Sequence, residues 1–341
     1  MKKLKIVIIG AGRAGMIHAR NFASYVPGVE LMGLVDPNMD ACQTSAGELG
    51  VSAAESPDEF YDQGADAVVI ASPTRFHRDI AVKAMKSGLH VLCEKPMAMT
   101  VAECRDMAET ASSTGKVFQV GFMRRFDAGF QEVARRLQAG EIGDPISIRS
   151  LTYGPSIPQP WMYDISASNG PLAEVNSHDI DTLFWYAGKE VEEVFAVAGN
   201  YRCPDAREKY PDFYDNVTMT VRFCDGTQGI VQGAQGVRYG YDSRCEVLGV
   251  NGLLTVGGLA ADTVRGYTPE GFSGNTVGSW RNLFTEAYLA EDIDFIDCIR
   301  NNRAPQAGAQ AGLQALEVVL AGNRSIRERR PVSLSEIREE V

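Results

Sequence analysis

The chain opens, over residues 4–36, with LKIVIIGAGRAGMIHARNFASYVPGVELMGLVD. A short apolar run leads into Gly10, Gly12 and Gly15, which have the G-x-G-x-x-G spacing, and an amphipathic stretch follows them. A second apolar run ends at Asp36, about 20 residues after the last of these glycines. A strand, a glycine turn, a helix and a strand that ends in an acid form the βαβ unit typical of dinucleotide binding.

The residues of the glycine turn have separate tasks. Gly10 permits the tight turn, Gly12 allows the backbone to approach a pyrophosphate, and Gly15 lets helix and strand pack closely. The following helix has unpaired N–H groups and a positive dipole end at its N-terminus, so it can receive phosphate groups. We therefore expect the cofactor to bind at Gly10, Gly12, Arg13, Ala14 and Gly15.

Asp36 predicts which nicotinamide cofactor binds. A carboxylate at this strand end accepts hydrogen bonds from the ribose hydroxyls and repels a 2′-phosphate. The next residues, Pro37, Asn38 and Met39, supply no cation for such a phosphate. The sequence favours NAD over NADP.

Composition indicates a globular protein with two domains. The chain has 341 residues, of which 45% are hydrophobic and 23% charged, and we expect a cofactor domain over 1–121 and a substrate domain over 122–341. The net charge of −11 argues against nucleic-acid binding. The seven cysteines form no C-x-x-C pair, no long apolar run predicts a membrane span, and the opening MKKLKIVIIGAG is explained by the glycine turn rather than by a signal peptide. We expect a cytoplasmic protein without a metal, because no His/Cys/Asp cluster has the spacing of metal ligands.

The first third of the chain alternates between apolar strand patterns and helical patterns. This alternation predicts a parallel sheet wound on both faces, a doubly wound α/β fold whose ligands bind at the carboxyl ends of the strands. The residues that follow the predicted strands, most of them polar or cationic, are gathered at that edge. They are Asp36, Ser72, Thr74, Glu94, Lys95, Met123 and Arg124, with His77 at the start of a helix beside them.

From about Gly121 the pattern changes to alternating strands joined by turns such as Asp225-Gly226. Such strands form an antiparallel sheet, so we expect an α+β second domain with an open-faced sheet. We expect continuous helices over 172–186, 282–300 and 309–328. An exposed apolar sheet face needs a cover, so we also expect a homo-oligomer, a dimer or tetramer, packed through this sheet.

Two groups could carry chemistry. Lys95, at the edge that carries the glycine turn, can hydrogen-bond a substrate oxygen and favour negative charge on it. Glu174 and His178 are four residues apart, and on one helix they would share a face, so that the carboxylate could orient the imidazole as a base. A capping carboxylate with a structural histidine explains the second pair equally well. We expect His77 to belong to the cofactor pocket and His18 to be structural.

At these residues the sequence resembles the glucose–fructose oxidoreductase/inositol dehydrogenase family. The matching motifs are GAGRAG with Asp36, ASPTRFH, CEKP, GFMRRFDAGF, the G-x-L-x-E-x-x-x-H-x-x-D stretch at 170–181, and YDSRCEVLG. The motifs GFMRRFDAGF and YDSRCEVLG are most similar to those of the inositol dehydrogenase branch. The resemblance implies a Rossmann domain, an open-faced antiparallel second domain, NAD(P), and hydride transfer at a carbon of a sugar or cyclitol.

The resemblance also implies roles for individual residues. The lysine of the EKP motif falls on Lys95, the general base of many members falls on His178, and the substrate-contacting region after the sixth strand falls on Met123 and Arg124. The family commonly has Asp where this chain has Glu174, so the substrate or the role of this carboxylate differs. The alternatives are a dehydrogenase or reductase of another sugar derivative, such as an anhydro, oxo or nucleotide sugar, and a non-catalytic NAD(P)-sensing regulator. A regulator should have lost the lysine or the histidine, and this chain keeps both.

Overall fold

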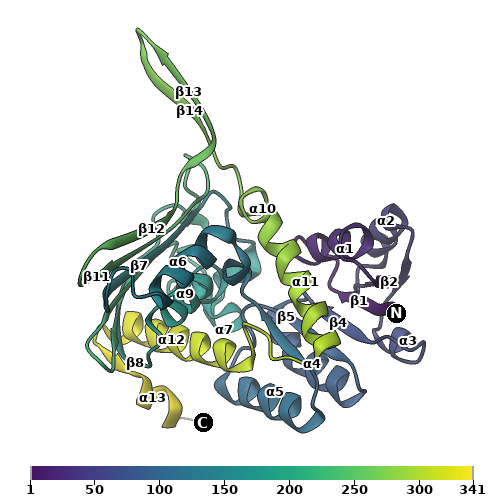
Figure 1. Cartoon of the computed structure of the whole chain (residues 1–341). Helices are drawn as coiled ribbons and strands as arrows, with labels where there is room; N and C mark the ends of the chain where they lie inside the picture. Colours follow the sequence, from purple (N-terminus) through teal and green to yellow (C-terminus); the bar gives the residue numbers. More distant parts are fainter. Residues whose placement is uncertain (1, 340–341) are drawn as a thin grey trace. The chain divides into compact units, whose positions relative to one another are not determined.

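The structure, a computed structural model, describes residues 2–339. The chain folds into two compact units. The first unit comprises Met1–Phe126 and Glu286–Gln314, and the second comprises Asp127–Thr285 and Ala315–Val341. Each unit is built around one large sheet (Figure 1).

The sheet of the first unit has six parallel strands in the order β3-β2-β1-β4-β5-β6. The chain moves outward from β1 to one edge and then returns to continue on the other side of β1. This order confirms the predicted Rossmann sheet. The strands are β1 (Leu4–Ile9), β2 (Val29–Val35), β3 (Ser52–Ala54), β4 (Ala67–Ile70), β5 (His90–Glu94) and β6 (Phe118–Gly121).

The helices of this unit follow the strands, as the sequence predicts for all but the short helix after β3. They are α1 (Gly15–Ser24), α2 (Met39–Leu49), α3 (Asp58–Tyr61), α4 (His77–Lys86) and α5 (Val101–Thr114), with short 3₁₀ turns η1 (Thr74–Phe76) and η2 (Met123–Phe126). Side chains alternate between the two faces of each buried strand, so Ile6 and Ile8 of β1 pack on the same side, in one core with Phe22 of α1. Thr100 and Glu103 form a capping box that starts α5.

A helix from late in the chain completes the core of the first unit. Phe295, Ile296 and Cys298 of α11 (Thr285–Asn301) belong to the same buried cluster as Ile6 and Ile8. The first unit therefore includes a segment that the predicted division at 121/122 assigned to the second domain. The helix expected over 282–300 is also interrupted, because the chain leaves helical geometry between α10 (Trp280–Leu283) and α11.

The sheet of the second unit has seven strands in the order β12-β11-β7-β10-β9-β8-β15. All neighbouring pairs are antiparallel except β7 and β10, which run parallel. The sheet is mainly antiparallel, as expected, but not a simple meander of hairpins, because β7 lies between two strands that come much later in the sequence. The strands are β7 (Pro145–Gly154), β8 (Val191–Gly199), β9 (Asn216–Phe223), β10 (Gln228–Gln235), β11 (Asp242–Gly249), β12 (Leu253–Gly257) and β15 (Val332–Ser333).

Helices cover one face of this sheet. Ile180 and Leu183 of α9 (Ser177–Ala187) and Val318 of α12 (Ala309–Glu328) line one small apolar space with Val221 of β9. The other helices are α6 (Ala128–Gln138), α7 (Ile165–Ser168), α8 (Gly170–Glu174) and α13 (Leu334–Glu339), with 3₁₀ turns η3 (Pro160–Tyr163) and η4 (Pro204–Ala206). The opposite face lies open, as predicted.

A hairpin that the sequence analysis did not predict follows β12. Strands β13 (Ala260–Thr268) and β14 (Gly271–Thr276) form a separate two-stranded sheet that extends away from the end of β12 (Figure 1). The side chains of Tyr267 and Phe272 lie against each other on this hairpin and are 78% and 66% exposed.

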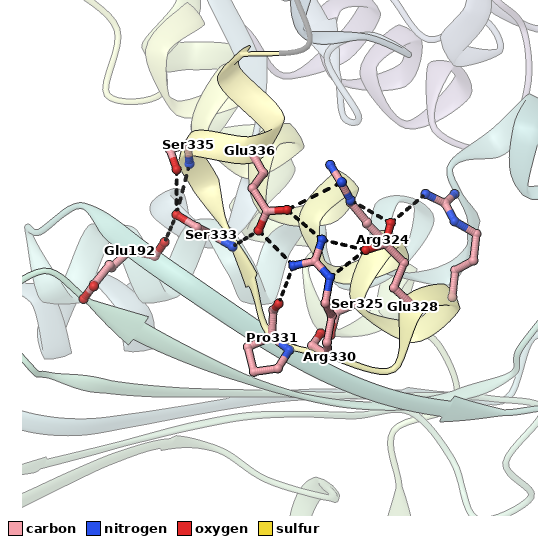
Figure 2. Close-up of polar contacts among 10 residues, drawn as sticks. Glu192, Arg324, Ser325, Glu328, Arg330, Pro331, Ser333, Ser335 and Glu336 are labelled. Atoms are coloured by element: carbon pink, nitrogen blue, oxygen red, sulfur yellow. Dashed lines mark hydrogen bonds and ion pairs between the residues drawn. The ribbon is translucent and has the colours of Figure 1, made fainter.

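A network of ion pairs attaches the C-terminal elements to the end of α12. The guanidinium group of Arg330 donates two hydrogen bonds to Glu336 of α13 and one to Glu328 of α12, and Glu328 also accepts from Arg324 (Figure 2). The hydrogen bonds from Arg330 hold the pKa of Glu336 at about 2. Ser325 connects this network to the sheet, because its hydroxyl donates to the carbonyl of Arg330 and accepts the N–H of Ala196 in β8.

No helix within residues 2–339 combines the length and the apolar character that a membrane crossing requires. All seven cysteines are free thiols, and only Cys224 is exposed. Burial raises the pKa of the Cys93 thiol, which lies in β5, well above its usual range.

Candidate active site

The carboxyl ends of the parallel strands lie in register at one edge of the first unit. Ile9 of β1 is paired with Val35 of β2 and with Ile70 of β4, and Glu94 of β5 is paired with Gly121 of β6. The residues that follow these positions therefore share this edge, as the sequence predicts.

The glycine turn is shaped by the packing of the chain itself. Gly10 has a φ of +102°, and a Cβ added there would lie 2.6 Å from the backbone of Ala71. A Cβ on Gly15 would lie 1.9 Å from the carbonyl oxygen of Gly10, so only glycine allows α1 to pack this closely on β1. A Cβ on Gly12 would meet nothing within 4 Å. The packing of the chain thus explains Gly10 and Gly15, whereas Gly12 faces open space that a pyrophosphate can approach.

Asp36 is fixed at the end of β2. Its Oδ2 accepts the N–H of Ala11 in the glycine turn, and its Oδ1 accepts the N–H of Asn38, both over 2.9 Å. The carboxylate is half-buried and rigidly oriented beside the turn. Arg13, the next residue after Gly12, is exposed, and Ala14 is half-buried.

The loop after β4 brings Ser72, Thr74 and His77 to the same edge. Thr74 is buried, and the buried Oγ of Ser72 has no hydrogen-bond partner among residues 2–339, so it can serve a bound ligand. The ring of His77 lies between two carbonyl oxygens, with Nδ1 2.9 Å from Pro96 O and Nε2 2.7 Å from Ser72 O. Burial lowers the pKa of His77. His77 therefore connects the loops after β4 and β5, and its place in the cofactor pocket stays a prediction.

Lys95 begins the loop after β5. The carboxylate of Glu94 accepts the N–H of Lys95 over 3.0 Å, and the Lys95–Pro96 peptide bond is cis. Glu94 is buried and the Lys95 side chain is half-buried. After β6, Met123 and Arg124 lie in η2, and each is only 1% exposed.

His178 and Glu174 lie in the second unit, but not on one helix. The continuous helix expected over 172–186 is broken between α8, which ends at Glu174, and α9, which begins at Ser177. The N–H groups of Val175 and Asn176 both donate to the carbonyl of Pro171, which closes α8, and the Asn176 side chain donates to the carbonyl of Gln232 on β10 as well as to Asp179 of α9. The prediction that the four-residue spacing places Glu174 and His178 on one helix face is therefore wrong.

A buried polar network, which the sequence analysis missed, anchors the first turn of α9. Asp179, next to His178, accepts hydrogen bonds from the hydroxyls of Ser150 (2.6 Å) and Thr152 (2.8 Å), both on β7. It also accepts from the side-chain amide of Asn176 over 2.8 Å. This network attaches His178 firmly to the sheet. Most partners of Asp179 are far from it in sequence. The only sequence signal for this network was the position of Asp179 near the N-terminus of a helix, where a carboxylate is favoured.

Comparisons with known proteins identify the family of the chain. Residues 4–122 match the family described as "Oxidoreductase family, NAD-binding Rossmann fold", and residues 130–255 match the "GFO/IDH/MocA C-terminal domain". The chain is 33% identical to a scyllo-inositol 2-dehydrogenase (NAD(+)) of Bacillus subtilis over 336 residues, which cover 97% of this chain and 96% of that protein. The chain belongs to the GFO/IDH/MocA oxidoreductase family.

Two further relatives support the same assignment. A myo-inositol 2-dehydrogenase of Thermotoga maritima is 31% identical over 337 residues, 98% of this chain and 99% of that protein. The crystal structure of scyllo-inositol dehydrogenase from Lactobacillus casei with bound NAD(H) and scyllo-inositol has a TM-score of 0.90 and 27% identity, and the match covers 98% of this chain and all of that chain.

This member of the GFO/IDH/MocA family is an NAD-dependent oxidoreductase that acts on CH–OH groups. Its glycine turn, the oriented Asp36 and the buried Ser72 hydroxyl fit a dinucleotide at the edge of the first sheet. Among residues 2–339, no group of three or more His, Cys, Asp or Glu side chains is arranged to hold a metal ion.

Proposed function

We propose that the protein oxidises a secondary hydroxyl of an inositol-like cyclitol to a ketone and, in reverse, reduces the ketone. The observation that carries this proposal is the first turn of α9, which hydrogen bonds attach to β7 and which carries His178. The same chain has a lysine loop, the loop that begins at Lys95 after β5, at the sheet edge that carries the dinucleotide turn. The relatives support a cyclitol, because two of them, at 33% and 31% identity, are named scyllo-inositol 2-dehydrogenase and myo-inositol 2-dehydrogenase.

In this mechanism His178 is the general base that removes the proton of the reacting hydroxyl. Lys95 donates a hydrogen bond to the same oxygen and stabilises the negative charge that develops on it. NAD, when bound, supplies the acceptor for the hydride that leaves the carbon. In the reverse direction, His178 returns the proton to the carbonyl oxygen.

The remaining assignments follow the same scheme. Residues 1–121 carry most of the cofactor site and residues 122–341 most of the substrate site, and Lys95 and Arg124 are assigned to both. We assign the cofactor to the glycine turn and the adjoining loops, and the substrate to Lys95, Met123, Arg124, Glu174 and His178. The cofactor residues are Gly10, Gly12, Arg13, Ala14, Gly15, Asp36, Ser72, Thr74, His77, Glu94, Lys95 and Arg124.

Glu174 supports a second candidate substrate. The break after α8 separates this carboxylate from the helix of His178, so Glu174 need not orient the imidazole. A carboxylate one methylene longer than Asp suits a ligand placed differently, such as another sugar derivative.

A substrate panel tests the proposal. Cyclitols, aldoses, anhydro and oxo sugars and nucleotide sugars would be assayed with NAD⁺ and with NADP⁺ by following the absorbance of the reduced cofactor. We expect turnover with inositols and NAD⁺. Turnover with another sugar class alone would favour the second candidate, and no turnover with any compound would favour a regulatory protein.

We also propose a cytoplasmic homo-oligomer, a dimer or tetramer, that packs through the open face of the second sheet. The register of the strands places Phe195 and Val197 of β8 and Leu248 and Leu253 of β11 and β12 on this face, where all four are exposed. Sedimentation or light scattering would measure the mass. Val197→Glu with Leu253→Glu should produce a monomer, and an unchanged mass would contradict the proposed interface.

A further inference from the structure

A chain of hydrogen bonds in the first unit leads to the lysine loop, which is the loop that begins at Lys95 after β5. Nδ1 of His18, on α1, lies 2.6 Å from Oδ1 of Asp292 on α11. Nε2 of the same ring lies 3.3 Å from Oε1 of Glu94. The other oxygen of Glu94 accepts the N–H of Lys95 over 3.0 Å. Hydrogen bonds thus link α11, α1 and β5, which are distant in sequence, and end at the backbone N–H of Lys95.

The His18 ring has little freedom to move. It is fully buried, and its edge packs against the ring of Tyr288 with centroids 5.4 Å apart. Asp292 is held in turn by the side-chain amide of Asn21 over 2.7 Å. Burial opposes the charged imidazolium, but the carboxylates of Asp292 and Glu94 outweigh it and keep the pKa of His18 well above its usual range. His18 can therefore donate from both ring nitrogens, which a neutral imidazole cannot do.

We propose that His18 is a positioning residue for Lys95: held by Asp292, it fixes the Glu94 carboxylate, which in turn fixes the backbone of the lysine loop. The inference rests on the proposed role of Lys95. It also gives α1 a second task, because the helix that begins at the glycine turn then orients the loop that carries the lysine. A histidine with a purely structural role would need only its contact with Asp292.

Two amide substitutions separate these roles. The side-chain nitrogen of Gln can occupy the place of Nε2 and reach Glu94, whereas that of Asn corresponds to Nδ1 and reaches only Asp292. We expect both H18Q and H18N to lower the melting temperature. His90→Asn is the matched control, because His90 lies at the other end of β5 and its Nδ1 accepts only the N–H of Val117. This control should keep wild-type turnover.

Two measurements report the outcome. Hydrogen exchange read by mass spectrometry follows the Lys95 amide in a peptide spanning residues 91–97. Steady-state kinetics with scyllo-inositol and NAD⁺ give kcat and the KM for NAD⁺. H18N should exchange the Lys95 amide faster and lose at least about tenfold in kcat, with the KM for NAD⁺ within about threefold of wild type. H18Q should keep wild-type exchange and most of its kcat.

Equal behaviour of H18N and H18Q in exchange and in kcat would overturn the proposal. If H18N does not fold, Glu94→Gln replaces it. Both oxygens of Glu94 face donors, and a side-chain amide has only one oxygen, so its NH2 group must face His18 or the N–H of Lys95. Wild-type exchange in that variant would equally overturn the proposal. Lys95→Ala is assayed beside these variants. Full activity of Lys95→Ala would disprove the proposed function, whereas the exchange measurement would still decide whether His18 orders the loop.

Discussion

Asn176 donates a hydrogen bond from Nδ2 to Oδ2 of Asp179 over 2.8 Å, across the first turn of the helix that carries His178. The same amide nitrogen donates to the carbonyl of Gln232 on β10 over 3.1 Å. The turn is therefore attached to the second sheet through both residues, and its position depends on the neighbouring backbone of β10.

A methyl group added to β10 at Gly233 should displace the first turn of α9 and with it His178. A Cβ on Gly233 would lie 2.0 Å from Oδ1 of Asn176, so Gly233→Ala must displace this side chain. A shift of about 1 Å at the reacting groups can cost about 100-fold in rate. We expect kcat to fall by about this factor while NAD binding, followed by fluorescence, is retained. Gly278→Ala, whose nearest contact is 3.9 Å away, is the control, and equal activity of both variants would contradict the argument.

His178→Ala tests the base directly. A general base contributes about 10²- to 10⁴-fold to the rate, so kcat should fall within this range while the dissociation constant of NAD⁺ stays the same. Wild-type turnover of the folded variant would remove His178 from the mechanism.

Glu174→Asp restores the residue that the resemblance leads one to expect. If the longer carboxylate matches the substrate of this chain, shortening it should lower kcat/KM for that substrate by about 10- to 100-fold. The ratio of kcat/KM between two inositol isomers should change as well. A variant with the same values for all isomers would show that this carboxylate does not contact the substrate.

Asp36→Ala should weaken the preference for NAD. The variant loses the acceptor for the ribose hydroxyls and the negative charge that repels a 2′-phosphate. We expect a higher KM for NAD⁺ and a lower KM for NADP⁺, measured with one substrate at saturation. The N–H of Ala11 also loses its partner, so melting curves must show that the variant is folded.

Glu291 should make the protein less stable as the pH rises. The side chain is fully buried in α11, and neither carboxyl oxygen has a hydrogen-bond partner among residues 2–339. Burial and the nearby Glu94 raise its pKa well above the usual range. The unfolded chain releases this proton near pH 4.3 while the folded protein retains it, so folding stability falls as the pH rises above that value.

Glu291→Gln removes the loss of folding stability that the buried carboxyl group causes as the pH rises. We expect a melting temperature at least about 2 °C higher than wild type at pH 8, with the difference shrinking as the pH is lowered towards 5. Glu317→Gln is the control, because Glu317 is buried but paired with Arg338, and its loss should lower the melting temperature. A constant difference across the pH range would contradict the role of Glu291.

The sequence predicts those features that depend on local pattern. The glycine turn, Asp36 and the loops after the strands are found where the spacing indicates. Only glycine fits the backbone at positions 10 and 15, so these two residues can be recognised in the sequence itself. The break between α8 and α9 has no such signal in the local sequence. It depends on a hydrogen bond from Asn176 to a strand 56 residues away.

Long-range packing accounts for the other differences. The pairing of His18 with Asp292 spans 274 residues, so neither residue can indicate the other within a local window. The same holds for the parallel pairing of β7 with β10 and for the exposed hairpin after β12. Both depend on the topology of the chain, which the spacing of hydrophobic residues does not predict.

Because α11 supplies Phe295, Ile296 and Cys298 to the first core, the nucleotide-binding half is made from both ends of the polypeptide. On the ribosome, the six parallel strands emerge early, yet the core around Ile6 and Ile8, already packed against α1, keeps an apolar surface that α11 covers only after some three hundred residues have been translated. A fragment that stops at Phe126 would keep every glycine of the turn and still expose this apolar surface. The core of the nucleotide-binding half is thus completed late in biosynthesis, when α11 is released.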